Sequence, residues 1–231
     1  MAALLCGRCL VVPAQEERGA PVRGMFYPAP MEVPWHFSVG VLTVTTPEEL
    51  TEEVRVRVPA VDLHVLRNIT GGFSAEGRAL VQVLQNNFSA GLRWNTALNE
   101  RFHFGVSDEA SYWFGVLDLE GFRARATGWT NRPGLSLGYH TRGDLLITLK
   151  AEALITTTLA YDVDGQRVVR DTDRLSGGAW SIYLEQPFFK KRSITLGFTA
   201  VYTKFLWATW ALFQTTDKPI FYPLITIGFI F

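Results

Sequence analysis

The feature that most constrains the fold is an alternation of apolar and polar side chains, which begins at Trp35 and continues to the last residue. A repeat of two residues is the period of a β-strand, because successive side chains of a strand point to opposite faces. In residues 88–95, one face carries Phe88, Ala90, Leu92 and Trp94. The same alternation recurs in residues 101–106, 135–140, 145–155 and 194–202. The chain is therefore predicted to be all-β.

Turn-forming residues separate these runs at short intervals, which is typical of hairpins joined one after another. They occur at residues 71–72, 86–87, 131–134, 142–144, 162–165, 176–178 and 215–218. We expect an antiparallel meander of about twelve strands, with about ten or about fourteen as near alternatives. The count depends on whether residues 166–172 form a strand and on whether residues 193–213 are divided near Lys204. None of the loops is long enough for an obvious plug or lid.

The alternation alone does not distinguish a soluble barrel, whose apolar side chains face inward, from a membrane barrel, whose apolar side chains face lipid. Two features favour the membrane barrel. Ionised residues stand in the middle of strands among glycines and serines, which suits a crowded and wet interior. Aromatic residues cluster near strand ends, as they do in the girdles of membrane barrels. We expect a meander closed into a transmembrane β-barrel, with interior charges at Arg93, Arg101, Arg123, Arg125, Lys150 and Glu152.

The chain ends on a strand, since Ile225, Ile227, Phe229 and Phe231 fall on one face of its last eight residues. Soluble domains more often end in a polar, frayed tail. This ending resembles the C-terminal aromatic signature of bacterial outer-membrane β-barrel proteins, and we assign the assembly signal to Gly228, Phe229 and Phe231. The resemblance covers roughly residues 35–231. It implies a place in the outer membrane of a Gram-negative cell envelope, with membrane lipid and the outer-membrane assembly machinery as partners.

The N-terminal part of the sequence differs in character from the barrel domain of residues 35–231. Residues 1–14 are mostly apolar and small, and we interpret them as the remnant of an export signal peptide. An ordinary N-terminal tail is the alternative, because Arg8 interrupts the apolar stretch and no basic region precedes it. Residues 15–34 contain four prolines and no apolar periodicity, which indicates an irregular segment.

The composition excludes several classes of protein. The 22 basic and 22 acidic side chains cancel and form no basic block, which argues against a nucleic-acid partner. The two cysteines, Cys6 and Cys9, have the spacing of a redox or metal motif, but no second pair or histidine cluster completes a site. We expect no cofactor and no metal.

The four histidines do not form a convincing catalytic group. Ser136 and His140 share one face of a predicted strand, but at about 13 Å apart they are too distant for direct proton transfer. Asp62 and His64 share a polar face and could orient each other, yet no nearby serine stands out as a nucleophile. These histidines are therefore expected to be interior or interface residues.

The arginines of the polar face allow two interpretations. They could favour anions at a constriction, or they could form ion pairs that stiffen a closed barrel. We favour the ion-pair network, with Arg78–Glu76 and Lys150–Glu152 among its pairs.

The function expected from the sequence is that of a non-catalytic outer-membrane β-barrel. It would act as a narrow pore, as a structural anchor or as the membrane component of an envelope complex with other envelope proteins. The first alternative is a lipid-modifying enzyme embedded in the barrel and using His140 or His64. The second is a soluble, calycin-like barrel that binds an apolar ligand inside.

Overall fold

The computed structural model describes residues 24–47, 57–119, 122–164, 166–169, 175–188, 192–212 and 218–231. Residues 1–14, interpreted above as the remnant of an export signal, lie outside the described residues, as do both cysteines. The strands are β1 (Trp35–Thr45), β2 (Arg57–Thr70), β3 (Phe73–Val81), β4 (Gln85–Ala97), β5 (Phe102–Leu119), β6 (Phe122–Asn131), β7 (Gly134–His140), β8 (Leu146–Val163), β9 (Gln166–Val169), β10 (Leu175–Phe188), β11 (Arg192–Thr203) and β12 (Ile220–Ile230). A short 3-10 helix, η1 (Trp207–Leu212), precedes β12.

Antiparallel pairing joins these strands into one sheet that closes on itself. β1 pairs with β2 along one edge and with β12 along the other, so the first and last strands meet. The wall then runs through β2, β3, β4 and β5, and returns through β8, β10, β11 and β12. Closure leaves no long row of unpaired N–H and C=O groups at a sheet edge. The prediction of a closed antiparallel barrel is confirmed.

The wall has ten strand positions rather than twelve, because β6 and β7 share one position between β5 and β8. β6 pairs with residues 110–119 of β5, and β7 pairs with residues 102–107 of the same strand. Residues 131–134, predicted to form a hairpin turn, therefore do not reverse the chain. Pro133 lacks a backbone N–H and interrupts the hydrogen-bond ladder without turning it.

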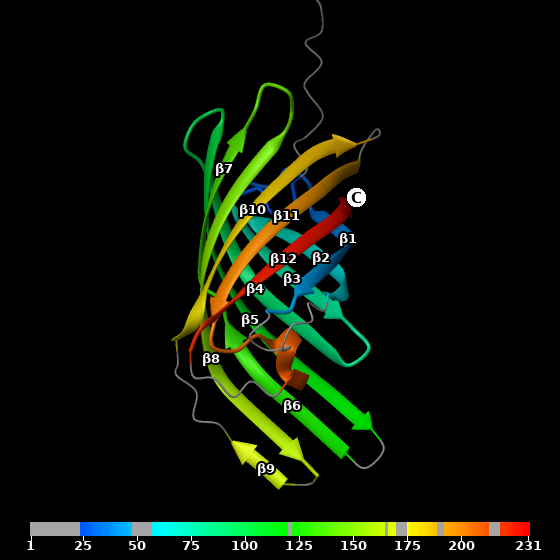
Figure 1. Cartoon of the computed structure of the whole chain (residues 1–231). Helices are drawn as coiled ribbons and strands as arrows, with labels where there is room; N and C mark the ends of the chain where they lie inside the picture. The colour runs from blue at the N-terminus through cyan, green and yellow to red at the C-terminus, as the bar shows by residue number, and fades with distance from the viewer. Residues whose placement is uncertain are drawn as a thin grey trace, which may run out of the picture.

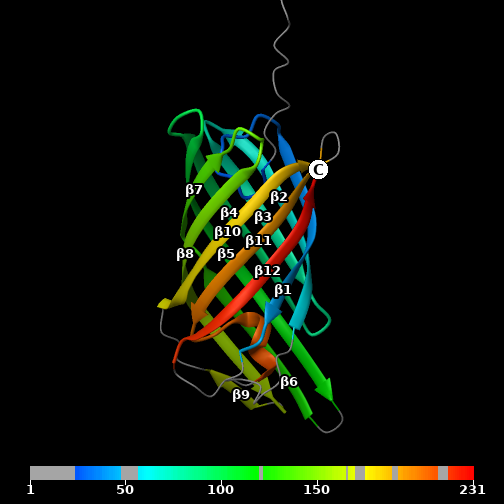
Figure 2. The ribbon, with the colours of Figure 1, turned by 45° about the horizontal axis from the view of Figure 1, so that its top comes forward.

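The other surplus strand is β9, which lies outside the closed wall. Among the described strands it pairs only with β8, at residues 160–163. In this region the ends of β5, β6, β8 and β9 reach beyond the other strands, at the lower end of the molecule in Figures 1 and 2. The predicted count of about twelve is thus wrong for the wall, although one of its stated alternatives was ten.

The barrel has two dissimilar ends. We call the end where β1 begins and β12 finishes the terminal end, and the opposite end the loop end; Figure 1 shows the terminal end at the top. A tight turn at Gly71 and Gly72, with φ of 56° and 84°, joins β2 to β3 at the terminal end. The helix η1 lies at the loop end. No helix within the described ranges is long and apolar enough to cross a bilayer.

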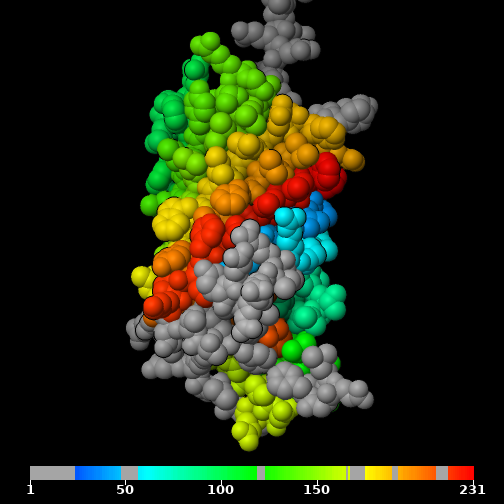
Figure 3. Space-filling model, viewed as in Figure 1, coloured from blue at the N-terminus to red at the C-terminus, as the bar shows by residue number. Residues whose placement is uncertain are grey.

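The apolar side chains of the wall point outward and the polar side chains point inward. In β4, Leu92 and Trp94 are exposed, whereas Arg93 and Asn95 between and beside them are buried. On another side of the barrel, the side chains of β10, β11 and β12 form a continuous oblique band (Figure 3). The predicted orientation of the faces is confirmed, and it is the reverse of the apolar interior that the calycin-like alternative requires.

Aromatic side chains form two rows on this apolar surface, one near each end of the wall. The row near the terminal end contains Trp35, Phe37, Phe73, Trp94, Phe102, Phe188, Phe229 and Phe231, and the row near the loop end contains Phe88, Trp129, Tyr202 and Phe221. From Phe221 to Phe229 the strand β12 rises roughly 27 Å at about 3.4 Å per residue. At a tilt of about 40° the rows are roughly 20 Å apart along the axis, close to the apolar band of about 25 Å in membrane barrels.

An arginine introduced on the outer face tests whether this surface lies in hydrocarbon. Ile225→Arg, near the middle of β12, is expected to lower the free energy of unfolding from lipid vesicles by about 2–4 kcal/mol. Leu175→Arg is the matched control, because Leu175 is also exposed but begins β10 at the loop end, where the cost falls to about 0–1 kcal/mol. Equal, small costs at the two positions in urea titrations would mean that water covers the outer face.

Candidate functional site

The interior of the barrel is the candidate functional site, and it holds three components. At the terminal end lies an inserted piece of chain, residues 24–34, called here the N-terminal segment. In the middle lies a set of ionisable residues, called here the charged layer: Asp62, His64, Glu76, Arg78, Arg93, Glu109, Arg132, Lys150 and Glu152. Toward the loop end lies a cavity covered by the residues around η1, called here the capped cavity.

The N-terminal segment is a plug that the sequence did not lead us to expect. Met25, Phe26 and Tyr27 are buried inside the barrel and pack among wall residues that include Leu66 and Tyr183. Residues 24–34 contain no helix or strand, and residues 15–23 of the segment expected to be irregular lie outside the described residues. The expectation that no loop is long enough for an obvious plug concerned only the connections between strands and did not consider this segment.

One carboxylate holds the N-terminal segment in place. The side chain of Glu185, on β10, is fully buried. It accepts hydrogen bonds from the backbone N–H groups of Met25 (2.7 Å), Phe26 (3.1 Å) and Tyr27 (2.9 Å). The hydroxyl of Thr195 donates a further bond of 3.2 Å. Three consecutive N–H groups around one anion form an anion-binding concavity, so the charge of Glu185 is compensated by the inserted chain itself.

Side chains from other strands bind the carbonyl groups of the N-terminal segment. Arg93, on β4, donates to the carbonyl of Met25 at 2.8 Å, and Asn95 donates to that of Ala29 at 3.2 Å. Asn68, on β2, donates to the carbonyl of Met31 at 2.8 Å. Donors from separate parts of the wall thus satisfy the polar backbone of an irregular chain, as burial of such a chain requires.

The wall is shaped to admit the ring of Tyr27. A Cβ atom added at Gly138 would lie 2.5 Å from that ring, and one added at Gly105 would lie 2.9 Å from Pro28. The Tyr27 hydroxyl lies 2.8 Å from Nδ1 of His103. Burial raises the pKa of Tyr27 to about 12, so the hydroxyl remains protonated at neutral pH, and it also lies 3.4 Å from the carbonyl of Arg101, to which it can donate.

The Phe26 ring connects the N-terminal segment to the charged layer. It stacks on Tyr183 with ring centroids 3.9 Å apart and planes inclined by 2°. The Arg78 guanidinium lies 5.9 Å from the centroid of the same ring, and the His64 ring lies 5.5 Å away. Removal of the segment would therefore uncover one side of the charged layer.

The charged layer consists largely of ion pairs. Arg78 binds Asp62 through two hydrogen bonds, of 2.8 Å from Nε and 2.6 Å from Nη2. Arg93 is paired with Glu76, whose Oε2 also lies 3.8 Å from Nε2 of His64. The expected pairing of Arg78 with Glu76 is wrong. Arg78 lies opposite His64 of the neighbouring strand β2, and its guanidinium binds Asp62, two residues before that histidine.

A second group of ion pairs surrounds the break between β6 and β7. Arg132 points inward and donates to Glu152 at 3.0 Å, while its other terminal nitrogen lies 3.8 Å from Glu109. Lys150 lies 3.0 Å from the other oxygen of Glu152, as expected from the sequence. Arg132 had been assigned to a turn, and the proline beside it gave no indication that its side chain would be central to the interior.

The interior charges predicted from the sequence divide into two groups. Arg93, Lys150 and Glu152 lie inside the barrel, as described above. Arg101 is exposed in the turn before β5, and Arg123 and Arg125 are exposed on the outer face of β6. The prediction is wrong for these three residues. In β6 the inward positions belong to Ala124 and Ala126, which are small and pack beside Trp113 and Trp210.

The residues of the predicted assembly signal lie at the end of β12. Phe229 and Phe231 are exposed on the outer face, and the Arg192 guanidinium lies 5.1 Å from the ring of Phe231. Gly228 pairs with Gly40 of β1, where the two backbones approach closely.

The histidines have structural contacts inside the barrel and at its terminal end. His36 lies 3.2 Å from the carbonyl of Gly24; since a carbonyl only accepts, its Nδ1 carries the proton. His140 lies 3.5 Å from Asp144 in the turn that follows β7. Within the described ranges, no group of three or more histidine, cysteine, aspartate and glutamate residues is placed to hold a metal ion.

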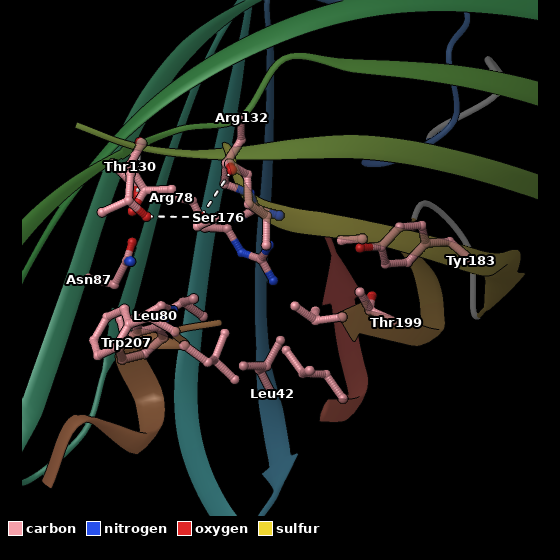
Figure 4. Close-up of a pocket in the computed structure, with 18 residues that line it drawn as sticks. Leu42, Arg78, Leu80, Asn87, Thr130, Arg132, Ser176, Tyr183, Thr199 and Trp207 are labelled. Atoms are coloured by element: carbon pink, nitrogen blue, oxygen red, sulfur yellow. Dashed lines mark hydrogen bonds between the residues drawn. The ribbon is translucent and has the colours of Figure 1, made fainter. Parts of the chain in front are cut away.

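The capped cavity occupies the interior between the charged layer and the loop end. Its volume is about 70 Å³. Arg78, Arg132, Thr130 and Ser176 lie along one side of it, and Leu80 and Trp207 lie on the other (Figure 4). The cavity thus has a cationic, hydroxyl-bearing side and an apolar side.

The cap consists of Phe205, Leu206 and the first residues of η1. Leu206 and Ala208 join the apolar cluster that includes Leu42 and Leu224 of the wall. Trp210 packs on the inner face of β5, close enough to Gly115 that a Cβ there would lie 2.2 Å from its ring. The sequence placed residues 193–213 on one or two strands, and the aromatic run after Lys204 proves to be this cap.

The ion pairs of the charged layer are expected to be much more sensitive to mutation than pairs on the surface. Asp62→Asn leaves the buried Arg78 guanidinium without its counter-charge and should lower the free energy of unfolding by about 3–5 kcal/mol. Asp118→Asn is the matched control, because the Asp118–Arg123 pair is 3.1 Å long but about 60% exposed, and its loss should cost less than about 1 kcal/mol. Replacing both partners, in Asp62→Leu/Arg78→Met, should recover much of the loss. Urea unfolding in detergent micelles measures all three, and equal effects for Asp62→Asn and Asp118→Asn would contradict the buried pairing.

Comparison with known proteins shows resemblance only among solved structures. No family model matches the chain, and no curated protein matches it. The NanC porin has a TM-score of 0.44 and 9% identity, with 84% of this chain and 98% of that chain covered. The KdgM porin in complex with disordered oligogalacturonate has a TM-score of 0.40 and 10% identity, with 84% and 98% covered. The translocator domain of the autotransporter NalP from Neisseria meningitidis has a TM-score of 0.44 and 9% identity, with 87% and 89% covered.

Proposed function

We propose that this protein is a non-catalytic outer-membrane β-barrel that forms a narrow pore, held closed by its own N-terminal segment. One observation carries the proposal: a polar, charge-paired interior runs inside an apolar wall and is blocked at the terminal end by buried residues of the chain. The contacts that hold this plug come from β1, β2, β4, β5 and β10.

The outer surface supports a place in a membrane. Exposed aliphatic side chains lie between two rows of aromatic ones, at a spacing that fits the hydrocarbon layer of a bilayer. Bacterial barrels of this kind have both termini on the periplasmic side. In that orientation the terminal end, with its plug, faces the periplasm, and the capped cavity lies toward the cell exterior.

The interior supports a pore better than a solid anchor. Buried ion pairs are often no more stabilising than well-packed apolar residues of the same volume, so a barrel that only anchors does not need them. A row of paired charges beside a cavity instead provides hydrogen-bonding groups along a path for water or small polar solutes. A structural anchor, or a membrane component of an envelope complex, is the outcome if no variant conducts.

Weakening the plug is expected to open the pore. In Glu185→Gln, an amide replaces the carboxylate that accepts from Met25, Phe26 and Tyr27, and its own NH₂ group would oppose those donors. Gly138→Val displaces Tyr27 by a separate contact, because the added atoms would overlap its ring. Both variants should show at least a roughly tenfold higher frequency of single-channel openings in planar bilayers than the closed wild type, as loss of several buried hydrogen bonds implies.

Two controls separate opening from general damage. Glu109→Gln neutralises another buried carboxylate, which lies beside Arg132 rather than the plug. Gly178→Ala adds a Cβ whose nearest neighbour is 3.4 Å away. Both should stay closed. If Glu185→Gln and Gly138→Val fold, as judged by heat-modifiable migration in gels, and yet remain as silent as the wild type, the pore is rejected in favour of the anchor.

We also propose that Gly228, Phe229 and Phe231 form the signal read by the outer-membrane assembly machinery. Phe229 and Phe231 are exposed on the strand that closes the barrel against β1. A partner that recognises this strand before closure would find two aromatic rings on one face.

Removal of the last ring tests this assignment. Phe231→Ala should lower the amount of folded protein in the outer membrane by at least about fivefold, while unfolding of the purified protein changes little, because an exposed side chain contributes little to the native state. Phe221→Ala removes an equally exposed ring at the other end of β12 and should leave assembly unchanged. Similar yields of the two variants in fractionated membranes would count against the signal.

A further inference from the structure

The charged side chains that line the capped cavity are of one sign. Arg78 and Arg132 both line it, and no carboxylate is found among the described residues that do. Their partners, Asp62, Glu109 and Glu152, contact them from outside the cavity lining. These carboxylates compensate the two positive charges, but the charged groups on the cavity side are guanidinium donors, which bind carboxylate oxygens through charge-assisted hydrogen bonds.

One donor on this side of the cavity is unused. Within the described part of the chain, the Nε–H of Arg132 is buried and has no hydrogen-bond acceptor. The ion pairs of Arg132 with Glu152 and Glu109 use its two terminal nitrogens and leave this N–H without a partner. Buried donors are nearly always paired in native proteins. An acceptor in the cavity would satisfy this N–H, and a carboxylate oxygen forms the stronger, charge-assisted bond to a guanidinium.

The opposite side of the cavity suits a short hydrocarbon chain. Leu42, Leu80, Leu206, Leu224 and Trp207 line it, and they belong to the apolar cluster beneath the cap or pack against it. The nearby hydroxyls of Thr156 and Ser176 are satisfied by each other and by the carbonyl of Leu154. These groups therefore do not compete with the arginines for a ligand.

We propose that the capped cavity is a binding site for a short-chain alkyl carboxylate of about the size of butyrate. The carboxylate would accept from Arg132 Nε and from Arg78, and the alkyl chain would lie against Leu80 and Trp207. This inference rests on the proposed function only where it places the site on the path of the pore. Binding of the carboxylate does not require that the barrel conducts ions.

The size of the cavity sets the length of the chain. The cavity has a volume of about 70 Å³. On the same scale of volume, one water molecule needs about 10–15 Å³. The space therefore holds about five or six atoms of that size, and butyrate has about six non-hydrogen atoms. Longer chains would have to displace the cap.

The experiment compares four probes with full-length protein refolded in detergent micelles in the presence of each. Butyrate supplies charge and chain, 1-butanol supplies the chain alone, formate supplies the charge without an alkyl chain, and butylammonium reverses the charge. Nuclear Overhauser contacts from the probe to methyl groups of Leu42, Leu80 and Leu206 report occupancy of the cavity. Butyrate should bind at least about tenfold more tightly than butanol, as charge-assisted bonds imply, and butylammonium should give no contacts.

Two variants and two controls locate the site. Arg132→Lys keeps a positive charge beside Glu109 and Glu152 but removes the Nε–H, and should weaken butyrate binding about tenfold. Leu80→Phe fills the apolar side and should abolish the contacts to Leu42 and Leu206. Arg125→Gln and Leu149→Phe change charge and size on the outer face and should leave binding unchanged.

The outcomes of this experiment are separable from those of the pore measurements. The site is overturned if the folded wild type shows no butyrate contacts, or if Arg132→Lys and Leu80→Phe bind butyrate as tightly as the wild type does. Either result overturns the site even if the plug variants conduct. Equal affinity for butanol overturns the role of the arginines and leaves an apolar pocket. Butyrate binding with silent plug variants supports the site and rejects the pore.

Discussion

The pairing of β1 with β12 is the interaction on which the rest of this structure depends. These two strands are the farthest apart in sequence in the described wall, yet they are neighbours in the sheet. Seven residues of each are paired, from Ser38 opposite Ile230 to Val44 opposite Leu224. Without this ladder, two edges of a large sheet would be open, and unpaired backbone groups are untenable in an apolar solvent. Once this ladder forms, the period-two alternation gives every strand one face toward the outside of the barrel and one toward its interior. The polar composition of the interior follows from that division.

The inside must then solve a problem that an apolar core does not have. Ionisable side chains confined in a narrow space need partners, and the wall supplies some of them to itself, as Asp62 does for Arg78. Glu185 has no basic partner among the contacts of its carboxylate, and it is neutralised by backbone N–H groups from residues before the barrel. The plug is thus part of the electrostatic balance of the wall, and its removal would leave a buried anion that water must enter to solvate.

Much of this architecture could be predicted from the sequence, because alternation is a local signal. The direction of the faces, the burial of Arg93 and the proximity of Lys150 to Glu152 all depend on strand period alone. The failures share a different cause. Residues 131–134 have the composition of a turn, but whether the chain reverses there depends on pairing across the sheet, since β6 and β7 both pair with β5 and with β8. Arg123 and Arg125 were misplaced because alanines, which carry no strong polarity, hold the inward positions between and after them.

The plug and the cap were missed for the same reason. Neither has a period, and their contacts are made across the lumen rather than along a strand. The run of Met25, Phe26 and Tyr27 within a proline-rich stretch was the available signal, since three large apolar residues are unusual in a linker. The density of aromatic residues around Trp207 was the corresponding signal for the cap.

The shared position of β6 and β7 has a mechanical consequence. β5 and β8 each run for 18 residues without interruption, and the strand position between them is divided into β6 and β7. Arg132 stiffens the wall at this division, because its guanidinium contacts Glu109 on β5 and Glu152 on β8. Any force that spreads the wall sideways will concentrate there, so the barrel has a built-in seam beside the capped cavity. The seam is held by the ion pairs of Arg132 and by two backbone hydrogen bonds, from Arg132 N–H to the carbonyl of Glu109 and from Ala153 N–H to the carbonyl of Pro133.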